Sequence, residues 1–326
     1  MKKLLAIFLA ALMLLGVFSG CQTEKAPEQT EPTQSAQEQE VLRILTIGNS
    51  HTVDTNLLLY YVFQNEMPEQ KLMLGNMYHS GCAVSQHVSH FKLQLPAYTY
   101  YKNTGEGWKQ TPQVSLETAL KDQVWDIVIL HEMNTGAGIE QTYWKDHYQE
   151  LLDYVNQTTE YPPKIIWNFS WANPTSQELW DLGFPGNWTG SYRELYNTDY
   201  VNMLTQMAHY TQKHVMVKKE FSAMIPTGTA FCYARNEMGQ SDEVLYRDYT
   251  HISDYGSLLA AYVWYSTITG KTEITEVNVD VIPSGMRCAQ TIGKGDIEVT
   301  QEMKDVIIKS VNFALKNPWK VTPVKE

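Results

Sequence analysis

The sequence predicts an α/β fold with a mainly parallel sheet and helices on both faces. Short β-favouring segments alternate with segments of helical spacing from about residue 41 to the end. Residues 125–130 (WDIVIL) are apolar on both faces, which is typical of a strand in the middle of a parallel sheet. No second break in composition and no internal repeat divides this part of the chain, so we expect one domain with insertions.

The first half of this domain is predicted to supply three strands of the sheet and a hairpin. Leu42–Ile47 is a β-favouring run that ends at Gly48, and Val53–Asn65 has helical spacing. The segment Gly48-Asn49-Ser50-His51 therefore lies where a strand turns into a helix. The other elements expected here are a strand at 71–78 with a turn at 80–81, a hairpin at 98–101 and 107–109, a helix at 115–121 and the strand at 125–130.

The second half is predicted to continue the alternation. Its expected elements are a helix at 143–157, a buried strand at 164–169, a long loop at 172–196, a helix at 199–214, a strand at 221–225, a helix at 256–269 and a helix at 301–315. Gly270 and Pro318 lie where the last two helices should end.

The N-terminus has the pattern of a secretory signal. Lys2 and Lys3 precede an apolar run at 4–17 that is too short for a permanent membrane span. The segment at 18–21 (FSGC) resembles the lipobox of bacterial lipoproteins, which implies cleavage before Cys21 and lipid on that residue. An ordinary secretory signal with an incidental cysteine is the alternative.

The chain is thus predicted to comprise a lipoprotein signal peptide at 1–20, a flexible tether at 21–40 and one large α/β domain at 41–326, with inserted loops near 94–114 and 172–197. The tether contains almost no apolar side chains and cannot bury a core. We expect an extracytoplasmic protein that is held at the membrane through its lipid anchor.

The net charge argues against one class of partner, and the cysteine count limits the number of disulfides. The net charge is −11, and loss of Lys2 and Lys3 changes it to −13 (−11 − 2), which argues against a nucleic-acid partner. Besides Cys21 the chain has Cys82, Cys232 and Cys288, so at most one disulfide forms within it, and the pairing stays open. We expect these three to be small buried residues.

The candidate nucleophile is Ser50, at the predicted carboxyl edge of the sheet, where sites form in α/β folds. The helix N-terminus behind it favours developing negative charge. About two hundred residues later, Asp248 precedes His251 by three positions, a spacing at which the carboxylate orients the ring and leaves one nitrogen to accept the serine proton. We expect a triad of these three residues; a helix cap and a surface ion pair are the alternatives.

Two further residues are candidates for an oxyanion hole together with the Ser50 N–H. Gly81 follows the second predicted strand and Asn134 follows the third, on the side of the sheet where Ser50 is expected. A backbone N–H and a side-chain amide are suitable donors to a tetrahedral oxyanion. A plain turn and a loop cap are the alternative interpretations of Gly81 and Asn134.

The order and spacing of these segments resemble the four blocks of the SGNH (GDSL-type) hydrolases. The resemblance is closer to a bacterial branch, the DUF4886 type, and runs from about Leu42 to Lys271. It implies a flavodoxin-like three-layer α/β/α sandwich and hydrolysis of esters, often acetyl esters of carbohydrates. The segments that carry it are 45–50 (LTIGNS), Gly81, 126–130 (DIVIL), 226–230 (PTGTA), Asp248 with His251, 251–253 (HIS), Gly256 and 264–265 (WY).

Two positions depart from the family pattern. Asn49 occupies the usually acidic position before the nucleophile, and 131–135 (HEMNT) stands where Gly-x-Asn-Asp is usual. Asn134 is one residue early, so His131 or a backbone N–H is the alternative oxyanion donor.

No metal or other cofactor is predicted. The pair His131-Glu132 lacks the second histidine of a zinc-protease helix, because position 135 is threonine. His79, His87 and His90 are interpreted as surface histidines.

We therefore expect a serine esterase that acts on a carbohydrate or glycan ester, and the resemblance implies that the ester is of the O-acetyl type. A lysophospholipase- or thioesterase-type acyl hydrolase and a non-catalytic glycan-binding lipoprotein are the alternatives. Aromatic side chains in the two inserted loops would suit sugar rings, or they pack the loops onto the domain; these are Tyr98, Tyr100, Tyr101, Trp108, Trp171, Trp180, Trp188 and Tyr192.

Overall fold

The structure is a computed structural model that describes residues 40–174, 192–197, 199–240, 242–280, 282 and 299–321. The predicted signal peptide, nearly all of the tether, Cys21, Cys288, Trp180 and Trp188 lie outside these residues. None of the helices in the described ranges is both long and apolar enough to cross a membrane.

A seven-stranded sheet forms the centre of the domain, in the order β4-β3-β2-β1-β5-β6-β7. Strands β2, β1, β5, β6 and β7 are parallel, and their order is that of flavodoxin-like folds. The antiparallel hairpin β3–β4 extends the sheet beyond β2. The strands are β1 (Leu42–Gly48), β2 (Leu72–Tyr78), β3 (Tyr98–Asn103), β4 (Trp108–Val114), β5 (Ile127–Leu130), β6 (Lys164–Asn168) and β7 (Phe221–Ile225).

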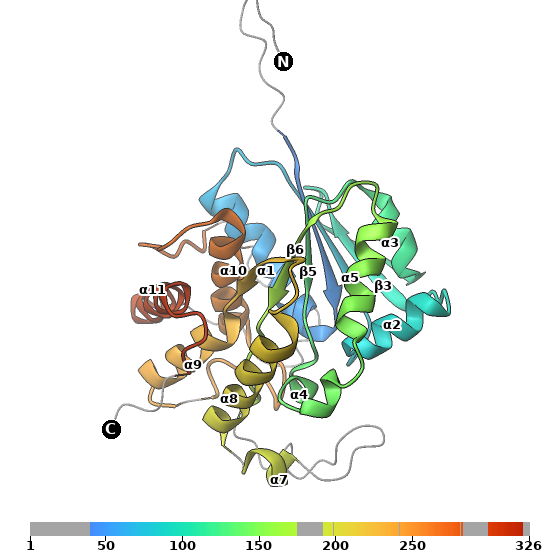
Figure 1. Cartoon of the computed structure of the whole chain (residues 1–326). Helices are drawn as coiled ribbons and strands as arrows, with labels where there is room; N and C mark the ends of the chain where they lie inside the picture. The colour runs from blue at the N-terminus through green and yellow to red at the C-terminus, as the bar shows by residue number, and fades with distance from the viewer. Residues whose placement is uncertain are drawn as a thin grey trace, which may run out of the picture. The chain divides into compact units, whose positions relative to one another are not determined.

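Helices cover both faces of the sheet (Figure 1), as the sequence predicts. On one face α1 contacts α10, and α9, α10 and α11 contact one another. On the other face α5 contacts α2 and α3. The helices are α1 (Ser50–Glu66), α2 (Val84–Lys92), α3 (Leu116–Asp122), α4 (Asn134–Ala137), η1 (Glu140–Tyr143), α5 (His147–Thr158), α7 (Tyr192–Tyr196), α8 (Tyr200–Tyr210), η2 (Thr211–Val215), α9 (Thr227–Glu237), α10 (Asp254–Thr269) and α11 (Gln301–Lys316).

Alternation along the central strands divides the interior into two cores. Ile44 of β1 and its partner Ile127 of β5 lie in the core beneath α1 and α10. Their neighbours Leu45 and Val128 lie in the opposite core with α2, α3 and α5. Because successive side chains of a strand point to opposite faces, the apolar run of β5 fills both cores. The predicted α/β fold with a doubly covered sheet is thus confirmed.

Several elements differ from their predicted extents. Helix α1 begins at Ser50 rather than near residue 53, because Asn49 caps it and accepts a hydrogen bond from the His51 N–H. Helix α9 was not expected, since its first residues, Thr-Gly-Thr, are weak helix formers. Gly228 is needed there because a Cβ would collide with the carbonyl of Ser170. The predicted loop at 172–196 ends in the short helix α7.

Candidate active site

Three of the predicted site residues meet at the carboxyl edge of the sheet. Ser50 follows β1 as the first residue of α1, and His251 precedes α10. The distance from Ser50 Oγ to His251 Nε2 is 2.9 Å, and the distance from His251 Nδ1 to Asp248 Oδ2 is 2.9 Å. A carboxylate only accepts, so Nδ1 carries the hydrogen and Nε2 is left to accept the Ser50 proton.

The Asp248 carboxylate is held by its own loop. Its Oδ1 accepts hydrogen bonds from the backbone N–H of Thr250 at 2.9 Å and from that of His251 at 2.7 Å. Partial burial alone raises the pKa of Asp248, but these bonds and the His251 ring outweigh it and hold the pKa well below its usual range. Asp248 is therefore a permanent anion that orients the His251 ring.

A buried ion pair joins this loop to the nucleophile helix. Arg247 donates from Nη1 to Asp54 Oδ2 at 2.9 Å and from Nη2 to Asp54 Oδ1 at 3.1 Å. Arg247 Nη1 also donates to the carbonyl of Ile252. Asp54 lies one helical turn after Ser50, so the pair fixes the loop that bears His251 relative to Ser50. Sequence reasoning missed both residues, although a charge next to Asp248 and an acid near Ser50 were visible signals.

Two backbone N–H groups are available for an oxyanion. Neither the Ser50 N–H nor the Gly81 N–H donates a hydrogen bond to another residue of the described ranges. Gly81 lies in the exposed turn after β2 with φ of +57°, a conformation that favours glycine. Asn49 supports this turn, because its Nδ2 donates to the carbonyl of Cys82 at 3.0 Å.

Asn134 is placed differently from the other predicted donors. It is the first residue of α4, its side chain is fully buried, and its Nδ2 donates to Asn173 Oδ1 at 2.5 Å. Its amide is thus bonded within the protein, and its role at the oxyanion stays a prediction.

Comparison with known proteins identifies the family. Residues 43–280 match the family model described as a domain of unknown function, DUF4886. The chain belongs to the DUF4886 family. Its fold is similar to that of a DUF4886 family protein from Bacteroides uniformis, with a TM-score of 0.69 and 23% identity over 87% of this chain and 98% of that chain. A comparison with curated proteins gives no match.

Two more solved structures are distantly similar to this DUF4886 chain. One is a protein from Slackia heliotrinireducens that is provisionally assigned as an SGNH hydrolase, with 18% identity over 70% of this chain and 100% of that chain and a TM-score of 0.44. The other is a catalytic mutant of an acetylxylan esterase from Geobacillus stearothermophilus. It has 16% identity over 70% of this chain and 94% of that chain, with a TM-score of 0.40.

His131 lies directly beneath the nucleophile turn of the DUF4886 domain. A Cβ on Gly48 would come within 2.6 Å of His131 Nε2 and within 2.5 Å of Thr52 Cγ2, so only glycine fits there. Burial lowers the pKa of His131 to about 4, and the ring is neutral at physiological pH. Both of its ring nitrogens lack a hydrogen-bond partner among the described residues.

Glu132 is a buried carboxylate that sequence reasoning did not assign. It accepts from the backbone N–H of Met133 at 2.8 Å, from that of Val84 at 3.3 Å and from the Tyr148 hydroxyl at 2.6 Å. Burial raises its pKa to about 7 despite these bonds. By holding Val84 at the start of α2, Glu132 secures the far end of the turn that bears Gly81.

His51 lines the site next to the triad. Its ring is 4.6 Å from that of Trp171, and its Nε2 lies 3.3 Å from Thr250 Oγ1. Trp171 in turn donates from Nε1 to the carbonyl of Thr250. Burial, together with the neighbouring His131, lowers the pKa of His51. A neutral His51 and Trp171 thus pack against the loop that carries His251.

The interpretation of His79, His87 and His90 as surface histidines is wrong for His87. His87 is fully buried, with its Nδ1 2.8 Å from the Tyr98 hydroxyl, and burial lowers its pKa to about 3. His90 approaches the same hydroxyl at 3.3 Å. The three histidines gather around Tyr98 because the turn after β2 brings α2 against β3. Among the residues that the structure describes, no group of three possible ligands is arranged to hold a metal ion.

The predicted aromatic residues whose side chains the structure describes fall into two groups. Tyr98, Tyr100 and Trp171 are 1%, 7% and 0% exposed, so they pack their segments onto the domain and offer no face to a sugar. Tyr101 and Trp108 are half-buried and line a pocket. Cys82 and Cys232 are buried, as expected of small core residues.

Proposed function

We propose that this chain is a serine ester hydrolase in which Ser50, His251 and Asp248 form the catalytic triad. The observation that carries the proposal is the unbroken series of contacts from Asp248 through the His251 ring to Ser50 Oγ, with distances of 2.9 Å at both steps. The same order of groups activates serine in unrelated hydrolases.

In the proposed mechanism His251 Nε2 removes the Ser50 proton as Oγ attacks the ester carbonyl. The N–H groups of Ser50 and Gly81 stabilise the resulting oxyanion. His251 then gives its proton to the departing alcohol, which leaves an acyl-Ser50 ester. Water, deprotonated by His251, hydrolyses that ester and restores the free serine. Asn134 joins the oxyanion hole only if its amide turns away from Asn173.

The substrate that we propose is an ester of a carbohydrate or glycan, with O-acetyl as the first acyl group to test. Support comes from the four sequence blocks, which resemble those of SGNH hydrolases. A lysophospholipase- or thioesterase-type substrate is the second candidate. It is favoured by the apolar pocket that Tyr101 and Trp108 line.

The proposal is tested with the 4-nitrophenyl esters of acetate and octanoate and with the soluble domain from residue 41. Turnover that disappears in Ser50→Ala is the expected result, and acetylated glycans would then be screened for release of acetate. Turnover that survives in Ser50→Ala contradicts the proposed nucleophile. Absence of Ser50-dependent turnover, combined with glycan binding, would favour the non-catalytic lipoprotein.

We also propose that Cys21 carries the lipid that holds the protein at the outer side of the membrane. The support is the sequence of residues 2–21 alone. Cells fed an alkyne-bearing palmitate should label the wild-type protein and leave Cys21→Ala unlabelled and released from membranes. Equal labelling of both proteins would contradict the assignment.

A further inference from the structure

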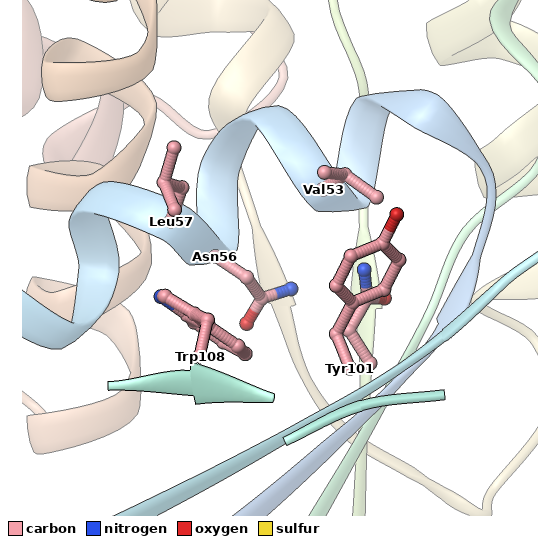
Figure 2. A pocket seen from close by; sticks show the side chains of 6 residues that line it. Val53, Asn56, Leu57, Tyr101 and Trp108 are labelled. Carbon is pink, nitrogen blue, oxygen red and sulfur yellow. The ribbon is translucent and has the colours of Figure 1, made fainter. Parts of the chain in front are cut away.

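An apolar pocket of about 80 Å³ lies between α1 and the hairpin at the edge of the sheet. Figure 2 shows the rings of Tyr101 and Trp108 beneath α1, with the Tyr101 hydroxyl directed toward Val53. The surface of the pocket is apolar, and its lining residues are Val53, Asn56, Leu57, Asn76, Tyr101 and Trp108.

Both amides of the pocket make hydrogen bonds behind its surface. Asn56 donates from Nδ2 to Thr46 Oγ1 at 3.0 Å and to the carbonyl of Thr52 at 2.8 Å. Asn76 Oδ1 accepts from the Thr52 hydroxyl at 2.8 Å. Because the surface of the pocket is apolar and its lining contains no charged side chain, the pocket suits an apolar ligand.

Strand register and helix spacing connect this pocket to the nucleophile. Tyr101 pairs with Asn76 across β3 and β2, so the two side chains share the face of the sheet that α1 covers. On α1, Val53 and Leu57 follow Ser50 by three and seven residues, positions that share one face of a helix. The pocket thus lies between α1 and the hairpin, one to two helical turns beyond Ser50 and on the same face of the helix.

The position of His251 decides which part of an ester extends this way. His251 must protonate the leaving alcohol, so the alcohol lies on the His251 side of Ser50. His251 lies just before α10, which packs on α1 and also contacts β7. The pocket is formed with β2, β3 and β4, at the opposite end of the strand order. The acyl group therefore points away from His251 and toward the pocket.

The length of the path limits the acyl group. At 1.5 Å per helical residue, Val53 and Leu57 lie about 4.5 and 10.5 Å along the axis from Ser50. An acetyl group ends near Ser50, whereas a chain of several methylenes reaches the rings of Tyr101 and Trp108. We propose that the pocket receives the acyl chain of the substrate, so that apolar acyl groups longer than acetyl are preferred. This inference rests on the proposed hydrolase function, and it predicts that acetyl, the first acyl group to test, is accepted but turned over less efficiently than longer acyl groups.

The test measures kcat/KM for 4-nitrophenyl acetate, butyrate, hexanoate and octanoate in the wild type and three variants. Leu57→Trp fills the pocket, and Trp108→Ala enlarges it. Leu93→Trp is the matched control, because Leu93 is 67% exposed at the end of α2 and lies outside the pocket. Each variant is first checked for folding by its thermal unfolding transition.

The wild type should gain about fourfold in kcat/KM for each methylene that enters the pocket. The hexanoate-to-acetate ratio should fall at least tenfold in Leu57→Trp and stay at the wild-type value in Leu93→Trp. Trp108→Ala should move the preference toward octanoate. A ratio near one in the wild type, or an unchanged ratio in Leu57→Trp, overturns the acyl site while Ser50-dependent turnover leaves the hydrolase proposal intact.

A second measurement applies even if no ester is turned over. Saturation-transfer NMR with hexanoate and the Ser50→Ala protein should show contact of the ligand methyl with the protein. Adding Leu57→Trp to that protein should abolish the signal, and adding Leu93→Trp should preserve it. A signal that is absent, or that is indifferent to Leu57→Trp, overturns the acyl site independently of catalysis.

Discussion

The ion pair between Arg247 and Asp54 should be a large contribution to both stability and activity. The side chain of Arg247 is 6% exposed and that of Asp54 is 0% exposed, and two hydrogen bonds join them. Arg247→Met preserves volume but leaves a buried carboxylate without its cation. Removing one partner of such a pair costs about 3–5 kcal/mol. For a domain of this size, that cost lowers the melting temperature by roughly 6–20 °C.

The loss of folding stability in Arg247→Met should depend on pH. In the wild type, burial raises the pKa of Asp54 to about 6, and the Arg247 cation opposes the increase. Without Arg247 the pKa rises further, while the unfolded value stays near 3.8. The folded variant therefore binds more protons than the unfolded chain above pH 3.8, and its stability decreases with rising pH by up to about 1.4 kcal/mol per unit. The difference in stability between the wild type and Arg247→Met should therefore be larger at pH 8 than at pH 5.

The assay is urea unfolding of both proteins at the two pH values, with ester turnover recorded at pH 8. Lys121→Met is the matched control, because its partner Glu117 is exposed and the pair should contribute at most about 1 kcal/mol. The double variant with Asp54→Asn should recover part of the loss, since it removes the stranded charge. A stability difference between the wild type and Arg247→Met that is below about 1 kcal/mol and equal at both pH values would contradict the reasoning that a buried ion pair fixes the loop.

Three further predictions concern single positions. Gly48→Ala should destabilise the domain by about 1–3 kcal/mol, because the new Cβ overpacks the site. Gly136→Ala is the control and should change stability little, because its new Cβ meets no atom closer than 3.5 Å. Equal melting temperatures of the two variants would contradict this packing. Asp248→Asn should lower kcat by about 10⁴-fold at neutral pH with little change in KM, because the His251 ring loses its orienting anion; steady-state kinetics will decide. The pKa of Glu132 is about 7 in the folded protein and 4.5 in the unfolded chain, so wild-type stability should fall by about 3 kcal/mol as pH rises from 4.5 to 7. Urea unfolding should show a flatter dependence of stability on pH in Glu132→Gln. An unchanged dependence would mean that another group causes it.

Much of the fold was predictable because it follows local patterns. The run at 125–130 predicted a central strand, and β5 lies between β1 and β6 in the middle of the sheet. The alternation of β-favouring segments with segments of helical spacing likewise predicted the helices on both faces of the sheet. The hairpin at 98–114 was recognised, but its pairing with β2 depends on a register between distant strands that no local pattern encodes. Helix α9 was missed because packing against Ser170 overrides the weak propensity of its first residues.

The candidate site was predictable where chemistry is concentrated in short motifs. Ser50, Asp248 and His251 were selected from their spacing, and the structure brings them together. The supporting residues were not found, because a buried carboxylate such as Glu132 or Asp54 looks like any surface acid until its burial is known. His87 was misjudged for the same reason, since its burial depends on how α2 packs onto β3.

The measurement that tests the central claim most directly is covalent labelling with a fluorophosphonate, which reacts with serines activated by a neighbouring base. The triad predicts one adduct per wild-type chain, located at Ser50 by peptide mass mapping, little reaction in His251→Ala and none in Ser50→Ala. An adduct on another residue, or labelling of Ser50 that is as fast in His251→Ala as in the wild type, would contradict the assignment of Ser50 as a nucleophile activated by His251.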